Sequence, residues 1–424
     1  MDIHAKIEPA HRDDHSLKKN LTYDYSLEGI RGLAAVSVAL AHVFDVKNFL
    51  DPTYHPHIYF SSLQAGHSAV LLFFVLSGYV IGLTIKKDFS IEQAHNYILR
   101  RAIRIFPIYF IAICLGVLAE PKEKLTIILG NLFFLQNFDR YFSFSLPPIA
   151  GDGAVWSLNY EILYYLVFIL LWWLRPKILD LLLGIFFLSA IGWFVLLFPQ
   201  FIAGYASGWV FWLSGLLLSW KVQPFGKEDS FFPLFSYLLL FHATNHLLTG
   251  KYILDALDFT NPVASHVNFS DLTILPICIL IIAEVTRRYF LGFIYLRLLS
   301  FLIPIFHLVW ISFQGRVLQE PKLVASSLFV ILALLLLNYK ISTDALKKIN
   351  FMGRISYAFY LLHTPIAVLM YKYFPWQGNV FTFCLGLLIW LVFTISLSSF
   401  LELAIQPKIK YYLSTILLLT QANA

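Results

Sequence analysis

The sequence predicts an all-α membrane protein: a polytopic bundle of about ten to twelve transmembrane helices with both termini in the cytoplasm. Of its 424 residues, 59% are hydrophobic and only 13% are charged. Soluble domains are roughly 45–50% apolar and about 25% charged. The mean hydropathy is +0.72, and apolar runs of helix length recur along the whole chain. We therefore expect the lipid bilayer to surround most of the protein.

The charged residues predict the orientation. The net charge is +6, with 31 Lys and Arg against 25 Asp and Glu, and in a membrane protein such an excess marks cytoplasmic loops. Nucleic-acid binding is not expected. The basic loops at 86–104, 175–177, 221–230, 287–290 and 339–353 should face the cytoplasm. We expect a multi-pass protein of the inner or plasma membrane.

The expected spans follow one another from residue 27, and breaks at prolines leave their number open. They cover residues 27–46, 68–85, 105–119, 154–174, 178–198, 201–220, 231–249, 271–286, 291–313, 321–338, 354–373 and 380–402. Residues 126–138 are too short to cross, and 339–350 should form a short interfacial helix. Tails at 1–22 and 411–424 should flank one membrane domain at 23–410.

Two ionisable residues of the first span, Arg31 and His42, are the main candidates for a site. Arg31 stands near the start of this span and His42 lies eleven positions later, about 16 Å along a helix axis. An imidazole that deep in a bilayer is costly unless it serves a function, which predicts a site. The alternative is that Arg31 is a cytoplasmic anchor and His42 a hydrogen-bonded structural residue.

Other polar residues interrupt later apolar runs. Arg100 and Arg104 are one helical turn apart, so we expect them to form a clamp for phosphate groups, unless they are ordinary cytoplasmic charges. Glu161 lies seven residues into a span, at a depth comparable to that of His42, and should pair with a His or Arg of another helix. Ser77 and Gly78 favour close helix packing.

A histidine and three cysteines favour structural interpretations. His363, in the middle of a late span, is interpreted as structural. The cysteines all lie in apolar runs, far apart and without metal-ligand spacing, so neither a disulfide nor a metal site is predicted. They are Cys114, Cys278 and Cys384.

Four motifs, in this order, resemble the acyltransferase-3 family of polytopic membrane O-acyltransferases. They are YSLEGIRGLAAVSVALAHVF, LFFVLSGYVIG, RRAIRIFPIYF with VWSLNYEILYY, and GRISYAFYLLHTPI. The resemblance covers nearly the whole chain. It implies transfer of an acyl group, commonly acetyl, from acyl-coenzyme A (acyl-CoA) to a surface saccharide or glycolipid such as lipopolysaccharide O-antigen, exopolysaccharide or peptidoglycan. No permanently bound cofactor is implied.

The resemblance also implies roles for individual residues. His42 is the expected general base and Glu161 the residue that orients it. The phosphates of acyl-CoA are expected on Arg31, Arg100 and Arg104, and the acceptor on Trp156, Ser157 and Tyr160. Two positions depart from the family pattern: His67 stands where a small or apolar residue is usual, and Gln406 replaces the acid of a Glu-x-Pro motif, with Glu402 as the nearest acid.

A transporter or flippase of an anionic or saccharide substrate is the alternative function. Such proteins also have many spans and buried ionisable residues, but they often contain repeated halves, and no repeat is visible here. The acceptor, the length of the acyl chain and the oligomeric state stay open. So does the choice between direct transfer with His42 as general base and transfer through a transient acyl-histidine.

Overall fold

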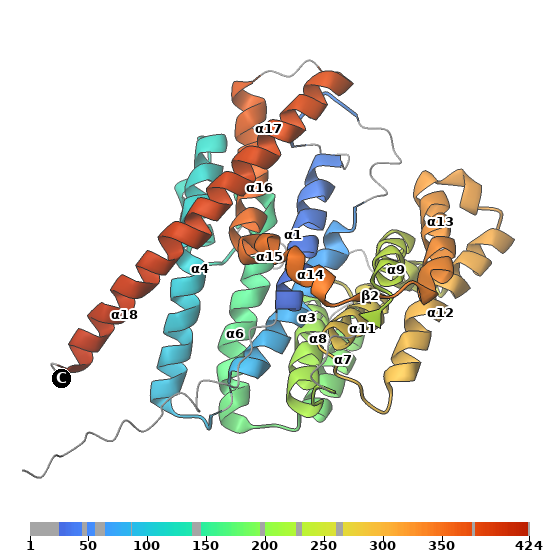
Figure 1. Ribbon diagram of the computed structural model, residues 1–424, viewed down its shortest axis with the longest axis horizontal. Helices are drawn as coiled ribbons and strands as arrows, with labels where there is room; N and C mark the ends of the chain where they lie inside the picture. Colours follow the sequence, from blue (N-terminus) through green and yellow to red (C-terminus); the bar gives the residue numbers. More distant parts are fainter. Residues whose placement is uncertain are drawn as a thin grey trace, which may run out of the picture.

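The long helices of the chain stand side by side in one bundle, as Figure 1 shows for the computed structural model. The structure describes residues 25–44, 49–55, 64–85, 87–137, 146–195, 200–225, 231–259, 266–374 and 378–422. The predicted N-terminal tail, 1–22, lies outside these residues. The predicted C-terminal tail, 411–424, is helical as far as Ala422.

The helices lie at these positions: α1 Tyr25–Phe44, α3 Gly66–Thr84, α4 Ile91–Ala119, α5 Leu125–Leu132, α6 Trp156–Leu174, α7 Ile178–Phe194, α8 Gln200–Lys221, α9 Leu234–Leu247, α10 Thr249–Ala256, α11 Leu275–Val285, α12 Phe293–Phe313, α13 Pro321–Leu335, α14 Asp344–Lys348, α15 Asn350–Arg354, α16 Ser356–Tyr373, α17 Val380–Ser399 and α18 Gln406–Ala422. Short 3-10 helices are η2 Gly153–Val155, η3 Phe269–Ile274, η4 Val317–Gln319 and η5 Leu336–Asn338, and η6 Phe400–Ile405 is a π-helix. The strands β1 Phe231–Phe232 and β2 Ile341–Ser342 pair antiparallel.

Eight of the described helices are long and apolar enough to cross a membrane, so the predicted polytopic all-α fold is confirmed. The other predicted spans, 178–198, 231–249, 271–286 and 354–373, form helices that are shorter or less apolar. They are α7, α9, α11 and α16. Residues 126–132 of the segment predicted at 126–138 belong to the short α5, and 339–350 contains β2, α14 and the first residue of α15. The side of the membrane on which the termini lie stays a prediction.

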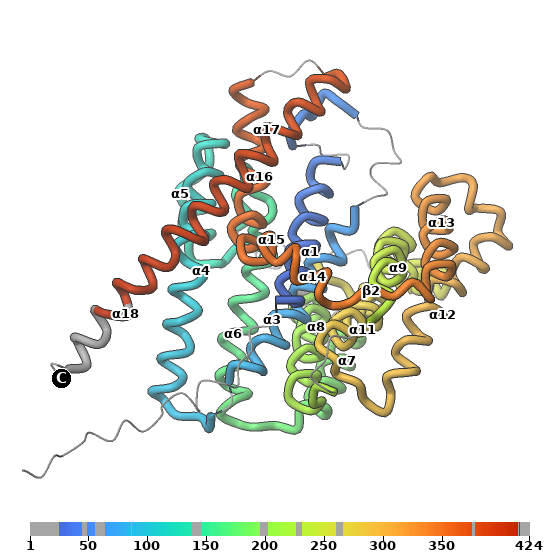
Figure 2. Tube along the Cα trace, in the orientation of Figure 1, coloured from blue at the N-terminus to red at the C-terminus, as the bar shows by residue number. Residues whose placement is uncertain are grey.

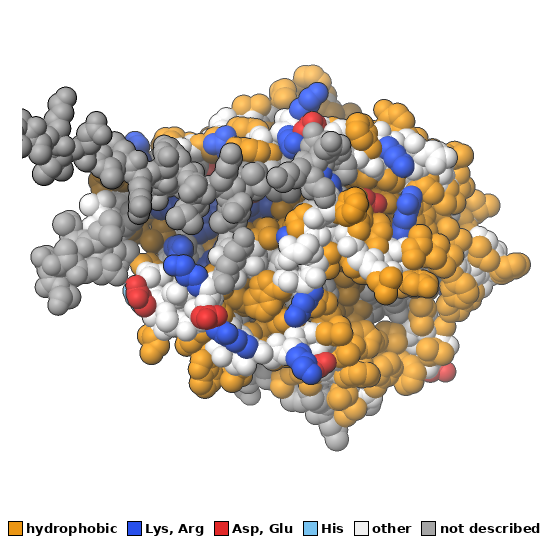
Figure 3. Space-filling view, turned by 60° about the horizontal axis from the view of Figure 1, so that its bottom comes forward, with side chains coloured by type: hydrophobic (Ala, Val, Ile, Leu, Met, Phe, Trp, Pro, Cys, Tyr) orange, Lys and Arg blue, Asp and Glu red, His pale blue; other side chains and the backbone are white. Residues whose placement is uncertain are grey.

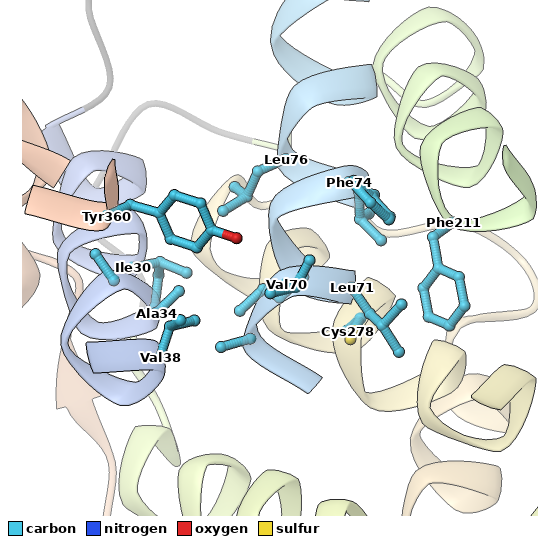
Figure 4. Close-up of a cluster of buried hydrophobic side chains, with 14 of the residues drawn as sticks. Ile30, Ala34, Val38, Val70, Leu71, Phe74, Leu76, Phe211, Cys278 and Tyr360 are labelled. Carbon is cyan, nitrogen blue, oxygen red and sulfur yellow. The ribbon is translucent and has the colours of Figure 1, made fainter. Parts of the chain in front are cut away.

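The core lies where α1, α3, α8 and α11 meet (Figure 4). Ile30, Ala34 and Val38 recur on α1 at the spacing of one helical face, and this face packs toward α3. Glycine brings α3 against α8. A Cβ on Gly78 would lie 1.9 Å from the Trp212 carbonyl oxygen, so only glycine permits this approach. The expected role of Gly78 in close packing is confirmed.

Two peripheral parts flank this core. α17, η6 and α18 form one continuous rod that leans across the bundle and passes α4 (Figure 2). α12 and α13 stand on the opposite side of the molecule (Figure 1). Their outward side chains are largely apolar and exposed, as expected of helices that face lipid.

Basic loops meet at one end of the bundle. The Trp172 indole donates to the Lys87 carbonyl at 3.0 Å, and Arg175 pairs with Asp88 at 2.6 Å. The backbone N–H of Phe225 donates to the Arg287 carbonyl at 2.8 Å. Lys and Arg side chains are distributed over this end in the space-filling view (Figure 3).

Candidate active site

A cavity of about 650 Å³ opens between α1, α3, α4, α6, α15, α16 and the rod. Its lining residues on α3 run from Val70 to Thr84, about 21 Å along the helix axis at 1.5 Å per residue. Thr84 ends α3 beside the basic loops, and Val70 lies well inside the bundle. The cavity is therefore long, and it runs from the basic end toward the middle of the protein.

Arginines line the cavity on several sides. Arg31 of α1 pairs with Glu28 at 3.0 Å. Arg104 of α4 pairs with Glu402, and its guanidinium carbon lies 5.4 Å from the ring centre of Tyr357. Arg101 lies 5.3 Å from the ring centre of Tyr165 and 5.6 Å from that of Tyr97. These fixed guanidiniums suit anionic groups such as phosphates.

Arg100 does not line the cavity. Its side chain is exposed, and its Nε donates to the Asn96 carbonyl of the preceding turn at 3.1 Å. The structure therefore brings Arg101 and Arg104 together at the cavity, where the sequence predicted Arg100 and Arg104. The signal was present in the sequence, because Tyr97, Arg101, Arg104 and Ile108 follow the three- and four-residue spacing of one helical face.

Glu161 also lines the cavity, but the predicted contact with His42 is absent. Its Oε1 accepts a hydrogen bond from Tyr165, and Ser77 Oγ lies 3.2 Å away. The reason lies in the register of α1 on α3, where Gly66 packs against Ala41. Ser77, beside Glu161, is about 16 Å further along α3, so Glu161 and His42 lie at different depths.

His42 lies against His363 in the structure. His42 Nδ1 lies 2.7 Å from His363 Nε2, and the ring planes differ by 23°. His363 is buried, and its Nδ1 lies 2.6 Å from the Tyr360 carbonyl oxygen. We call His42 and His363 the His pair. Sequence reasoning missed it because the two residues are 321 positions apart.

A hydrogen bond joins two residues of the cavity lining close to the His pair. Ser157 Oγ lies 2.8 Å from the Tyr360 hydroxyl, which donates to the Ala154 carbonyl at 2.9 Å. Both side chains line the cavity, and Tyr360 points from α16 toward α3 (Figure 4). Tyr360 precedes His363 by almost one turn of α16, and their ring centres are 6.0 Å apart, so the His pair lies close to these two lining residues.

The turn that receives Tyr360 is itself fixed by a buried acid. Asp152 Oδ1 accepts from the backbone N–H of Ala154 at 3.2 Å. Burial raises the pKa of the Asp152 carboxyl well above its usual range, although the hydrogen bond from Ala154 opposes this shift.

The other two predicted acceptor residues lie outside the cavity lining. Trp156 stacks on His266, with ring centres 4.5 Å apart, and Tyr160 packs on Tyr205 at 4.4 Å. Ser157 is therefore the residue of the predicted acceptor set that reaches the cavity.

Comparison with known proteins places this site in a family. The profile of the acyltransferase-3 family, described as an acyltransferase domain, matches residues 24–402. The peptidoglycan O-acetyltransferase OatA of Listeria monocytogenes serovar 1/2a is 27% identical over 200 residues, which are 42% of this chain and 29% of that protein. The chain thus matches less than a third of the length of this relative. No solved structure matches. The chain is a multi-pass membrane protein and belongs to the acyltransferase-3 family.

Proposed function

We propose that the protein is an O-acyltransferase that moves an acyl group, in the simplest case acetyl, from acyl-CoA to a hydroxyl of a surface or exported saccharide or glycolipid. Membership of the family supports the reaction class. The relative in Listeria is named for O-acetylation of peptidoglycan, which supports a saccharide as acceptor. The cytoplasm supplies the donor in this proposal, because the cavity lining reaches Thr84, at the end of α3 beside the basic loops.

Arg31, Arg101 and Arg104 are the proposed ligands of the donor phosphates. Each guanidinium can bind phosphate oxygens through two parallel hydrogen bonds. The apolar part of the wall, including Val70, Phe73 and Leu158, suits the less polar arm that carries the thioester. Arg100 faces away from the cavity and is not part of this proposed site.

The observation that carries the proposed chemistry is the hydrogen bond within the His pair. The Tyr360 carbonyl can only accept, so Nδ1 of His363 carries a hydrogen. In a neutral ring, Nε2 of His363 then accepts. Nδ1 of His42 at 2.7 Å and the Thr364 hydroxyl at 3.1 Å both lie within reach, and we assign the hydrogen to His42 as the nearer donor. Nε2 of His42 is left as the nitrogen with the lone pair. His363 thereby fixes the tautomer in which His42 can act as a general base.

The transfer step follows from this tautomer. Nε2 of His42 takes the proton of the acceptor hydroxyl while the oxygen of that hydroxyl bonds to the thioester carbonyl carbon. The carbon–sulfur bond then breaks, and the leaving thiolate receives the proton, so that an ester and free CoA are formed. Tyr360 and Ser157 line the cavity close to the His pair, and their hydrogen bond has to open for the acyl group to reach His42.

Membranes that contain the protein, incubated with acetyl-CoA labelled in the acetyl group, test the proposal. We expect label in an alkali-sensitive ester of the saccharide fraction, and none in membranes without the protein. A transporter or flippase would change the distribution of saccharide across the membrane without labelling it, and that result would contradict the proposed function.

A further inference from the structure

A buried carboxylate holds the cavity arginine Arg104 in place. The side chain of Glu402 is 2% exposed, whereas that of Arg104 is 35% exposed. Glu402 Oε2 accepts from Arg104 Nη1, and Oε1 accepts from the backbone N–H of Ala358 at 3.3 Å. The carboxylate therefore joins α4, α16 and the rod, and both of its oxygens are used. Both side chains line the cavity, and the Arg104 side chain is the more exposed of the two.

The rod holds Arg104 from a second position. Gln406 lies one turn after Glu402, and its Nε2 donates to the Ile103 carbonyl at 2.6 Å and to the Arg104 carbonyl at 3.4 Å. Glu402 therefore fixes the guanidinium, and Gln406 fixes the backbone from which the side chain extends. The aromatic face of Tyr357 is a third contact, 5.4 Å from the guanidinium carbon of Arg104.

The π-helix at Phe400–Ile405 explains how one helix presents both residues. Trp390, Thr394, Ser398, Glu402 and Gln406 are buried at four-residue intervals. In an α-helix, four residues turn about 40° more than a full revolution, so this series would drift around the surface. A π-turn is wider than an α-turn. The π-turn reverses this rotation of the buried series, so that Glu402 and Gln406 both face α4.

We propose that Glu402 is a positioning residue for donor binding: it fixes the guanidinium of Arg104 toward the phosphates of acyl-CoA. This inference rests on the donor site proposed above. The opposite role would be competition, in which Glu402 neutralises Arg104 and has to be displaced by phosphate. The two roles predict opposite changes in CoA affinity when the negative charge of Glu402 is removed: a loss if Glu402 positions Arg104, and a gain if Glu402 competes with phosphate.

Binding of CoA to the purified protein in lipid nanodiscs decides between them, since it needs neither acceptor nor turnover. Gln at position 402 has one acceptor oxygen where the structure uses two. Glu402→Gln should therefore weaken CoA binding by about tenfold and raise the KM for acetyl-CoA by a similar factor, with kcat much less affected. Glu320→Gln is the matched control, because Glu320 also pairs with an arginine, Arg316, at 3.7 Å but at an exposed position away from the cavity.

A double-mutant cycle separates positioning from general destabilisation. If Glu402 acts through Arg104, Arg104→Gln should cost little further affinity in the Glu402→Gln background. Glu402→Asp keeps the buried charge but withdraws it by one methylene, and should weaken binding in the same direction; this variant serves if Glu402→Gln does not fold. Unchanged or tighter CoA binding in these variants would overturn the inference and leave the donor site standing. Failure of the unaltered protein to bind CoA would overturn the donor site itself.

Discussion

Each of the three proposed phosphate ligands is held by a neighbouring side chain before any donor binds. Arg31 pairs with Glu28 and Arg104 with Glu402, and Arg101 lies against Tyr97 and Tyr165. Such contacts restrict the rotamers of long side chains, so less conformational entropy is lost when a ligand binds. The acids also reduce the positive charge inside the membrane, which is costly when it is unpaired.

Two adjacent arginines offer a matched test of the donor site. Arg101 lines the cavity, whereas Arg100 is exposed on the other side of α4. Arg101→Gln should raise the KM for acetyl-CoA by about tenfold, because it removes one charge-assisted contact to phosphate. Arg100→Gln should change it by less than about twofold. A larger effect at Arg100 than at Arg101, measured in membranes with equal amounts of protein, would contradict the proposed donor site.

Much of the cavity lining was visible in the sequence as polar residues inside apolar runs. Arg31, Arg104 and Glu161 are such residues, and the structure places all three on the cavity. Ser157, which the family resemblance indicated, also lines it. Their chemical roles stay predictions. The pairings could not be predicted, because the contact between His42 and His363 depends on the packing of α1 against α16, and one sequence contains no signal for it.

At the scale of helices, close packing of α3 on α8 depends on glycine. Gly78→Ala would place a Cβ 1.9 Å from the Trp212 carbonyl oxygen, so the helices would have to separate. We expect a loss of about 1–3 kcal/mol in stability, as for other overpacked cores, measured as a lower unfolding temperature in detergent. Gly184→Ala is the control: a Cβ there meets no atom within 4 Å, and Ala favours the helix. Equal stability of the two variants would argue against this packing.

Helix positions could be predicted better than helix details. The spans predicted at 27–46, 68–85 and 154–174 correspond closely to α1, α3 and α6, because hydrophobicity over twenty residues depends only on local sequence. α16 was predicted equally well at 354–373 although it is less apolar than the eight long spans. The π-helix at Phe400–Ile405 was not predictable, because it depends on contacts with α4 that are distant in the sequence.

For the whole molecule, the cavity and the His pair lie in series along the expected transport direction of the acyl group. The cavity lining reaches from Thr84, beside the basic loops, to Ser157 and Tyr360. His42 stands two residues before the opposite end of α1. This arrangement suits a donor from one side of the membrane and an acceptor from the other.

The orientation can be tested with single cysteines in a variant that lacks the three native ones. Asp88 and Lys122 are both exposed and lie beyond opposite ends of α4. A membrane-impermeant thiol reagent added to intact cells should label Asp88→Cys only after permeabilisation, and Lys122→Cys without it. Labelling of Asp88→Cys in intact cells would reverse the orientation and with it the cytoplasmic route of the donor.

The central claim is that His42, held in one tautomer by His363, removes the proton of the acceptor hydroxyl. Acetyl incorporation into saccharide, measured in membranes matched for protein amount, tests it most directly. His42→Ala should lower the rate by about 10²–10⁴, the usual contribution of a positioned general base, while CoA binding stays unchanged. His363→Ala should give a smaller loss, and His242→Ala none, since His242 lies outside the cavity lining and its Nδ1 is 2.8 Å from the Leu238 carbonyl oxygen of its own helix. Full transfer by a folded, CoA-binding His42→Ala variant would contradict the claim.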